Sequence, residues 1–165
     1  ACLEQSMPRV IDADALNRLA EEPLRGSDWV LTPHPGEAAR LLDCAIAEVE
    51  ADRRAAVIEI QKRYGGVCVL KGAGTLVAVT DGAVWLCDRG NPGMASAGMG
   101  DLLAGVIGGL LAQGLSTAHA ACAGAWLHAS AGDLAAGEYP RGLVARDLLE
   151  PLRRLVNRSC DVDDQ

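Results

Sequence analysis

Short apolar segments alternate with longer segments of helical periodicity along this chain of 165 residues. The segments that predict β-strands cover residues 9–12, 29–32, 67–70, 75–80 and 83–86. The third segment is apolar at every position, which predicts a strand buried on both faces. The last two flank Asp81-Gly82, a turn sequence typical of a β-hairpin.

Between these strands the apolar positions repeat with the period of a helix. One helix is predicted to open at Asp14, and the others cover residues 35–42, 47–64, 101–113, 117–136 and 146–156. Pro35 suits the first position of its helix, and Gly65-Gly66 end the helix that precedes them. Pro151 lies inside the last helical pattern, where it either kinks that helix or marks its first turn.

Strands that alternate with helices predict an α/β fold with a mostly parallel sheet flanked by helices. In such a sheet, ligands bind at the carboxyl ends of the strands. The segments that hold candidate polar residues each follow a predicted strand: Asp12 with Asp14, residues 32–37, residues 71–75 and the loop after Leu86. We therefore expect these segments to form one site at one edge of the sheet.

Composition and charge narrow the class of protein. Half of the residues are hydrophobic but only 3% are aromatic, which predicts a single domain with a core of Ala, Val, Leu and Ile. A net charge of −7 disfavours a nucleic-acid surface, and no apolar run is long enough to predict a membrane span. The six cysteines are scattered without metal-binding spacing, as in a reduced, cytoplasmic protein.

A glycine-dense loop over residues 90–98 leads into Met99-Gly100-Asp101 and an apolar helix. Glycines allow backbone N–H groups to approach an anion closely. A carboxylate in the first turn of that helix can serve as a base beside a transferring phosphoryl group, whose charge the helix terminus stabilises. The motif alone leaves open a plainer interpretation, in which Asp101 only complements the helix dipole.

Two other loops also suit a phosphorylated ligand. Residues 32–37 place His34 and Glu37 between a strand and a helix, and Arg40 shares a helix face with Glu37. Residues 71–75, Lys-Gly-Ala-Gly-Thr, place a lysine at a strand end, although the spacing is not that of a Walker loop. A capped loop histidine, a glutamate favoured by the helix dipole and a solvated lysine are the alternatives that the residues leave open.

Other catalytic patterns are not supported. His119 and His128 are nine residues apart on one predicted helix, so they lie on opposite faces and cannot share a metal ion. A Gly-x-Ser-x-Gly sequence is missing, which gives no support to a Ser/His/Asp triad.

Four segments, taken in order, resemble the motifs of one family. They are VIDADALN over residues 10–17, LTPHPGEA over 31–38, LKGAGT over 70–75 and GNPGMASAGMGD over 90–101. These are similar to motifs of the ADP/ATP-dependent NAD(P)H-hydrate dehydratases of the ribokinase-like superfamily. The resemblance runs from about Val10 to Val156, nearly the whole chain.

The resemblance implies a ribokinase-like three-layer fold. It also implies that residues 1–165 form a single domain, the C-terminal part of a dehydratase domain without that domain's N-terminal elements. Residues 1–7 look like the tail of a helix, which agrees with a chain that is the later part of a larger domain.

The resemblance implies a role for each matching residue. Asp101 is the catalytic base and also contacts the substrate. The other substrate-binding residues are His34, Pro35, Gly36, Glu37, Ala38, Ala39 and Arg40. The nucleotide-binding residues are Lys71, Gly72, Ala73, Gly74, Thr75, Asn91, Pro92, Gly93, Met94, Ala95, Ser96, Ala97, Gly98, Met99 and Gly100. Glu37 matches a superfamily glutamate that orients magnesium-bound water, and the N–H groups of residues 98–101 would form an anion hole.

The implied activity is repair of hydrated NAD(P)H. ADP or ATP would phosphorylate the hydroxyl at C6 of the hydrated nicotinamide, and elimination of phosphate would restore NAD(P)H. The resemblance implies Mg²⁺ as cofactor and an NAD(P)HX epimerase fused to the domain or working with it. The cysteines predict a cytoplasmic location, and the Ala-rich helices offer an apolar interface for the homo-oligomer that we expect. Similarity to bacterial fused forms favours ADP.

Two other functions remain as alternatives. A ribokinase-like kinase of a vitamin precursor alcohol would share the glycine loop and Asp101. Residues 34–37 and the long loop over residues 91–100 favour the dehydratase. A nucleotide-binding module without catalysis is the third hypothesis.

Overall fold

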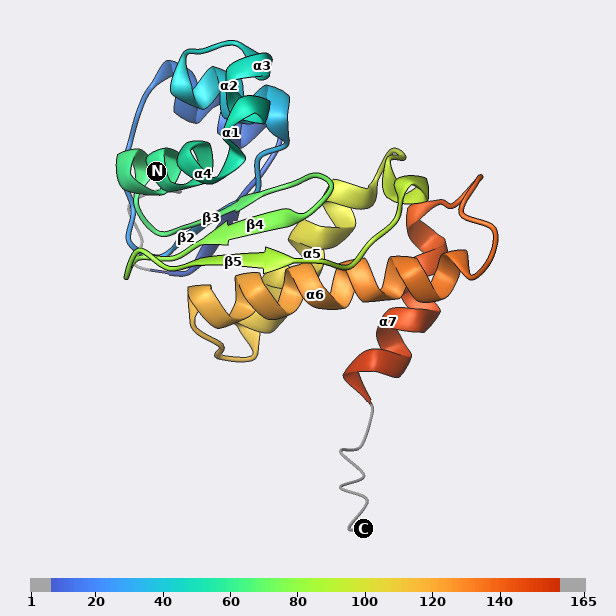
Figure 1. Cartoon of the computed structure of the whole chain (residues 1–165). Coiled ribbons are helices and arrows are strands. Elements are labelled where there is room, and N and C mark those ends of the chain that lie inside the picture. The colour runs from blue at the N-terminus through green and yellow to red at the C-terminus, as the bar shows by residue number, and fades with distance from the viewer. Residues whose placement is uncertain (1–6, 158–165) are drawn as a thin grey trace.

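The computed structural model describes residues 7–157, so six of the seven residues predicted as a helix tail lie outside the described part of the chain. The strands are β1 (Arg9–Ile11), β2 (Trp29–Leu31), β3 (Val67–Leu70), β4 (Thr75–Ala78) and β5 (Val84–Cys87). The α-helices are α1 (Asp14–Glu21), α2 (Pro35–Leu42), α3 (Ile46–Ala51), α4 (Arg53–Tyr64), α5 (Met99–Ala112), α6 (Thr117–Ala136) and α7 (Leu149–Val156). Figure 1 shows the sheet between two helical layers, with α1–α4 on one side and α5 and α6 on the other.

The sheet has the strand order β1-β2-β3-β4-β5. β1, β2 and β3 are parallel, while β4 is antiparallel to both β3 and β5. The α/β prediction is confirmed, and the predicted hairpin adds two antiparallel pairings that make the sheet mixed. Because β5 runs in the same direction as β3, the loop after β5 leaves the sheet at the edge where β1, β2 and β3 end.

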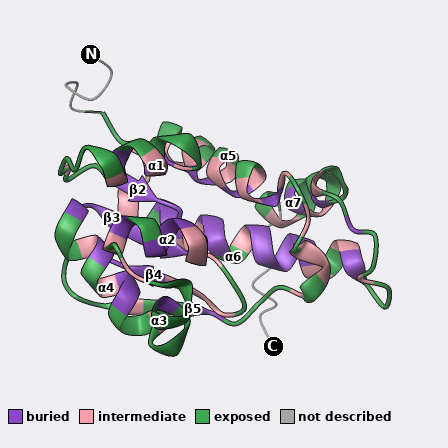
Figure 2. Ribbon diagram, turned by 90° about the horizontal axis from the view of Figure 1, so that it is seen from above, coloured by how far each residue is buried: buried purple, intermediate pink, exposed green. Residues whose placement is uncertain are grey.

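The alternation of side chains along β3 explains why this strand is apolar throughout. Cys68 and Leu70 pack with residues of α1–α4, whereas Val67 and Val69 pack with residues of α5 and α6. Figure 2 shows this buried interior in purple across the strands and along much of α6. The three-layer prediction is therefore confirmed.

Helix α6 packs closely because its buried face is made of small residues. A Cβ at Gly124 would lie 2.6 Å from Cγ1 of Ile107 on α5, so glycine sets the distance between these two helices. Farther along, Ala131 and Ala136 join a separate cluster with Leu148 and Leu152. One helix thus connects the core beneath the sheet with the C-terminal helix α7.

The prediction of one helix over residues 47–64 is wrong, because α3 and α4 are separate helices that meet at Asp52. The backbone of Asp52 has φ −144° and ψ 78°, which is not helical. Its carboxylate accepts a hydrogen bond from the N–H of Ala55 at 2.8 Å and caps α4. The apolar period continues across the break, so it concealed this N-cap.

The other helices agree with the sequence apart from their ends. α6 has the predicted bounds, and α5 begins at Met99, which places Asp101 in its first turn as predicted. A 3₁₀ turn over Ala145–Leu148 precedes α7, and a second covers Pro92–Met94 in the glycine loop. Pro151 is the third residue of α7, where its missing N–H removes no helical hydrogen bond.

Replacement of Gly66 by alanine should destabilise the fold strongly. Gly66 has φ +59°, and a Cβ there would collide with the carbonyl oxygen of Trp29. We expect Gly66→Ala to lower the free energy of unfolding by about 3 kcal/mol or more, from left-handed backbone strain and steric overlap. Gly82→Ala is the control, because Gly82 has φ +87° with open space around it, and should cost about 1 kcal/mol. Urea denaturation compares the two variants, and equal losses would contradict the steric explanation.

Candidate active site at the carboxyl edge of the sheet

Lys71 brings three of the four sequence motifs together. It directly follows β3, and its N–H donates a hydrogen bond to the carbonyl oxygen of Pro33 at 2.8 Å. Its ammonium donates to Oδ1 of Asp12 at 3.0 Å and lies 3.7 Å from Oε2 of Glu37. The residues that follow β1, β2 and β3 therefore meet at one point, as the sequence predicted.

This ion cluster is largely withdrawn from water. The side chains of Lys71, Asp12 and Glu37 are 19%, 14% and 8% exposed. A buried charge needs a partner, so removal of Lys71 would leave the carboxylates of Asp12 and Glu37 without their counter-ion. The ammonium of Lys71 is already compensated by carboxylates, and the cluster carries a formal charge of −1.

His34 caps helix α2. Its Nδ1 accepts hydrogen bonds from the N–H groups of Gly36 and Glu37 at 3.0 and 3.3 Å. In return the N–H of His34 donates to Oε2 of Glu37 at 2.8 Å, which completes a capping box. His34 therefore has the capping role that the sequence left open. Its side chain is half exposed at the surface beside the cluster.

The fourth motif reaches the same point through the N-terminus of α5. Gly98 is the N-cap with φ +84°, and a Cβ placed on Gly100 would lie 3.2 Å from Nζ of Lys71 and 3.8 Å from Oδ2 of Asp12. The N–H of Met99 donates to Ser96 O, whereas those of Gly100 and Asp101 have no acceptor among the described residues. The exposed side chain of Asp101 thus stands beside two free backbone donors.

The glycine loop is held from outside by α6 and by the loop that follows it. Asp133 of α6 accepts hydrogen bonds from the N–H of Gly90 at 2.9 Å and from Nδ2 of Asn91 at 3.0 Å. A Cβ on Gly93 would collide with the carbonyl oxygen of Pro140. These contacts give the loop between β5 and α5 a defined path.

The loop between β3 and β4 is held by Arg53, the first residue of α4. Its Nη2 lies within hydrogen-bond distance of the carbonyl oxygens of residues 70, 71 and 74. Oγ1 of Thr75 donates to the carbonyl oxygen of Gly72 at 3.2 Å.

Two predicted substrate residues are buried in the core, and the side chain of a third is bonded to α1. Ala38 and Ala39 are 0% and 5% exposed and belong to the core cluster of α1–α4, so their methyl groups do not face an open site. Nη1 of Arg40 donates to Oδ1 of Asn17 on α1 at 3.0 Å, which joins α2 to α1 at the exposed surface.

His128 is buried near this site, whereas His119 is exposed. Burial lowers the pKa of the His128 imidazole to about 4, against the raising effect of the Met99 backbone, and the Lys71 ammonium lowers it too. The ring is therefore neutral at pH 7, and its Nε2 has no partner among the described residues.

The described residues include no group of three or more His, Cys, Asp or Glu side chains that could hold a metal ion. Both oxygens of Glu37 already face partners, namely the N–H of His34, the His34 ring and Lys71. Protein ligands alone therefore do not form a magnesium site here. The donor set suits an ion that arrives on nucleotide phosphates and contacts a carboxylate through water.

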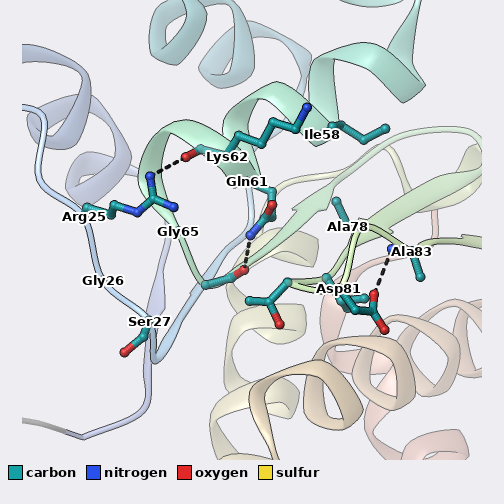
Figure 3. Close-up of a pocket in the computed structure, with 14 residues that line it drawn as sticks. Arg25, Gly26, Ser27, Ile58, Gln61, Lys62, Gly65, Ala78, Asp81 and Ala83 are labelled. Atoms are coloured by element: carbon teal, nitrogen blue, oxygen red, sulfur yellow. Dashed lines mark hydrogen bonds between the residues drawn. The ribbon is translucent and has the colours of Figure 1, made fainter.

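A cavity of about 810 Å³ lies at the opposite edge of the sheet, around Gly26, Gly65 and Gly82. Figure 3 shows that two of its polar side chains are bonded to backbone carbonyl groups of its wall: Arg25 donates to the carbonyl oxygen of Lys62, and Gln61 donates to that of Gly66. None of the predicted site residues lines this cavity. The candidate active site and this cavity thus lie at opposite ends of the strands.

Sequence reasoning missed Arg53 and Asp133 as supports of the predicted loops. Asp12 was noted at a strand end but received no role. A charged residue at a helix start or inside an Ala-rich helix is common on surfaces, so neither Arg53 nor Asp133 carried a local signal. Their partners lie 17 to 43 residues away in sequence.

Comparisons with known proteins agree with the geometry. The family model for NAD(P)H-hydrate dehydratase matches residues 1–154. The bifunctional NAD(P)H-hydrate repair enzyme Nnr of Coxiella burnetii is 55% identical over 156 residues, which are 94% of this chain and 32% of that protein. The ADP-dependent (S)-NAD(P)H-hydrate dehydratase of Neisseria meningitidis is 49% identical over 92% of this chain and 54% of its own length.

Solved structures show the same fold. The ADP/ATP-dependent NAD(P)H-hydrate dehydratase of Bacillus subtilis, co-crystallised with ATP and Mg²⁺ and soaked with CoA, matches with a TM-score of 0.79 at 31% identity. The match covers 90% of this chain and 55% of that one. A ribokinase-like protein of Enterococcus faecalis matches with a TM-score of 0.72 at 31% identity over 88% of this chain and 50% of its own. The chain thus spans about a third to a half of the length of these proteins.

The buried His128 should make stability depend on pH. Its pKa is about 4 in the folded chain and 6.5 when exposed, so the unfolded chain binds the extra proton between these values. Its contribution is complete above pH 6.5 and is lost as the pH falls towards 4, by up to roughly 3 kcal/mol at 1.36 kcal/mol per pKa unit. Urea denaturation at pH 7 and pH 5 should show a smaller loss for His128→Gln than for the unchanged protein. His119→Gln, at an exposed position, should keep the full loss, and identical pH profiles for all three proteins would contradict the assignment.

Proposed function

The chain belongs to the NAD(P)H-hydrate dehydratase family, and from this premise we propose that it carries the nucleotide-binding loops and the base of an enzyme that dehydrates NAD(P)H hydrate. The observation that carries the proposal is the convergence of Asp12, Glu37, Lys71 and Gly100 at one edge of the sheet. These residues come from the four motifs that characterise the resemblance.

Asp101 acts as the base. Its exposed carboxylate in the first turn of α5 removes the proton from the C6 hydroxyl of the hydrated nicotinamide. The hydroxyl oxygen then attacks the terminal phosphorus of the nucleotide, whose bridging P–O bond breaks. The C6–O bond breaks next, with the ring nitrogen lone pair expelling inorganic phosphate, and loss of a proton from C5 restores NAD(P)H.

The transferring phosphoryl group lies at the N-terminus of α5. The free N–H groups of Gly100 and Asp101 point to it together with the positive end of the helix dipole. The predicted anion hole covered residues 98–101, but the N–H of Met99 already bonds to Ser96. Three donors remain, and the proposal rests on those of Gly100 and Asp101, which lie in the first turn of α5.

The two glycine-containing loops hold the adenine nucleotide. Residues 71–75 reach α5 through Lys71, which lies beside Gly100, and residues 91–100 lead into that helix; both loops are fixed by contacts to helices. On the substrate side, His34 and Gly36 at the start of α2 are exposed enough to meet the nicotinamide dinucleotide. The buried side chains of Ala38 and Ala39 are not proposed as contacts.

Mg²⁺ would enter bound to the nucleotide phosphates, with Glu37 reaching it through water. The ion supplies charge neutralisation at the phosphates. The role of the protein is to keep the carboxylate of Glu37 oriented, which the capping box with His34 achieves.

The relatives suggest the wider setting. Repair enzymes such as that of C. burnetii are bifunctional, which supports an epimerase fused to this domain or working with it. We propose that residues 1–165 are the C-terminal part of the dehydratase domain, that ADP is the preferred nucleotide, and that the protein is a cytoplasmic homo-oligomer. Among the described residues, no helix has the length and apolar character needed to cross a bilayer.

Product analysis tests the reaction. Incubation with NADH hydrate, Mg²⁺ and ADP should give NADH absorbance and free phosphate in equal amounts. Asp101→Asn should keep ADP affinity but lower turnover by roughly 10²–10⁴-fold, because it removes the base at nearly constant side-chain volume. Glu59→Gln, an exposed position on α4, is the charge-matched control and should behave as the unchanged protein.

Three outcomes would contradict this assignment. A stable phosphorylated product without NADH would indicate a small-molecule kinase instead. Nucleotide binding without turnover would indicate a binding module. Activity of Asp101→Asn within a few-fold of the unchanged protein would remove Asp101 as the base.

Lys71 is expected to act on the outer phosphate of the nucleotide. Lys71→Met should weaken ADP binding more than AMP binding, because a point charge at this strand end faces the terminal phosphate. It should also destabilise the fold, because Asp12 and Glu37 lose their counter-ion.

The double variant Lys71→Met/Asp12→Asn separates these two effects. It should recover part of the stability lost in Lys71→Met without recovering ADP affinity. Calorimetric titration with ADP and AMP and urea denaturation give the two readouts. Equal losses of ADP and AMP affinity would show that Lys71 only maintains the ion cluster.

A further inference from the structure

Arg53 reaches from the start of α4 into the loop between β3 and β4. Its Nη2 lies 3.4 Å from the carbonyl oxygen of Leu70, 3.2 Å from that of Lys71 and 3.5 Å from that of Gly74. The side chain is only 17% exposed. One guanidinium thus gathers three carbonyl groups of a single loop on one side.

Because the peptide bond is planar, the direction of a carbonyl group also sets the direction of the N–H group that follows it. In a trans peptide the C=O of one residue and the N–H of the next point in opposite directions. With the Lys71 carbonyl turned to Arg53, the N–H of Gly72 points away from it. The N–H groups of Gly72 and Ala73 donate to no acceptor in the described part of the chain, so they are available to a ligand.

The fit of the guanidinium requires glycine in the loop. Gly72 has φ +144°, and a Cβ there would lie 2.7 Å from Nη1 of Arg53. The guanidinium is held in turn by Glu50, whose Oε1 lies 3.2 Å from Nη1. Glu50 also balances the charge of Arg53, so the contribution of Arg53 to the loop is orientation rather than net positive charge.

We propose that Arg53 is a positioning residue that turns the carbonyl groups of Leu70, Lys71 and Gly74 inward and so presents the N–H group of Gly72, beside that of Ala73, to the phosphates of the adenine nucleotide. This inference rests on the nucleotide-binding role proposed above for residues 71–75. Inward carbonyl groups remove the partial negative charges that would otherwise repel a phosphate. Outward N–H groups then form an anion-binding concavity.

A purely structural role would be a link between α4 and β3 that affects stability alone. The two roles differ in what they do to ligands. A positioning role affects ligands that carry phosphates and spares adenosine, which has none. It also requires that loss of Arg53 increase the motion of the loop before any ligand binds.

Two variants of Arg53 and one control test this proposal. Arg53→Ala removes the guanidinium, and Arg53→Lys keeps a charge beside Glu50 but cannot bridge three carbonyl groups. Arg54→Ala removes the exposed arginine next in the helix. Calorimetric titration with ADP and with adenosine, and ¹⁵N relaxation of the amides of residues 72–74 without ligand, are measured on all four proteins.

For Arg53→Ala we expect ADP affinity to fall by about tenfold, the loss of hydrogen bonds to a charged group, with adenosine affinity unchanged. Order parameters of the loop amides should fall from values near 0.85 towards 0.6. The ADP affinity and the loop order parameters of Arg53→Lys should lie between those of Arg53→Ala and those of the unchanged protein. If Arg53→Ala does not fold, Arg53→Lys alone tests the proposal. Arg54→Ala should match the unchanged protein in both measurements.

Equal ADP affinity in the Arg53 variants and the unchanged protein would overturn the proposal, as would equal losses for ADP and adenosine. Unchanged order parameters would overturn it as well, because the loop would then not depend on Arg53. Failure of the unchanged protein to bind ADP would refute the proposed function itself, and this inference with it. A loss confined to the Arg53 variants, by contrast, leaves the proposed function intact.

Discussion

The buried ion cluster of Lys71 with Asp12 and Glu37 is the constraint on which the arrangement of the site depends. Asp12 and Lys71 directly follow β1 and β3, and Glu37 lies in the first turn of α2, the helix after β2, so the cluster fixes the relative positions of three chain segments. Charges this far from water persist only when paired. The N-terminus of α5 lies against the same ammonium, where the absence of a side chain on Gly100 leaves the necessary room. The ends of the three parallel strands, the segments that follow them and the N-terminus of α5 are therefore all in contact at this cluster.

Much of this arrangement could be predicted from the sequence, because the signals are local. The apolar run over residues 67–70 and the helical period over residues 117–136 identify their elements directly. The hairpin follows from its turn residues, and the shared edge of the site follows from parallel strands that end together. Because the strands are parallel, the residues that follow them in the sequence lie close together in the structure.

The parts that could not be predicted depend on pairs of residues far apart in the chain. The break between α3 and α4 is set by a capping side chain at Asp52 that the apolar period conceals. The partners of Arg53 and Asp133 become visible only after folding, because an isolated arginine or aspartate is equally suited to a solvated surface. The burial of Ala38 and Ala39 likewise follows from the packing of α2 on the core, whereas their motif suggested substrate contact. The ligand roles of the site residues remain predictions.

The small residues of α6 allow this helix to set the position of the glycine loop, although the helix itself carries no predicted site residue. Gly132 admits the side chain of Met94, since a Cβ there would collide with the sulfur atom, and the next residue, Asp133, holds the beginning of the same loop. A single added methyl group on this helix would therefore be transmitted to the glycine loop as a displacement. An activity defect caused by such a change would be hard to distinguish, in kinetics alone, from the loss of a catalytic group. In this fold the path of the glycine loop is set by how closely two unreactive surfaces, those of Gly132 and Met94, fit together.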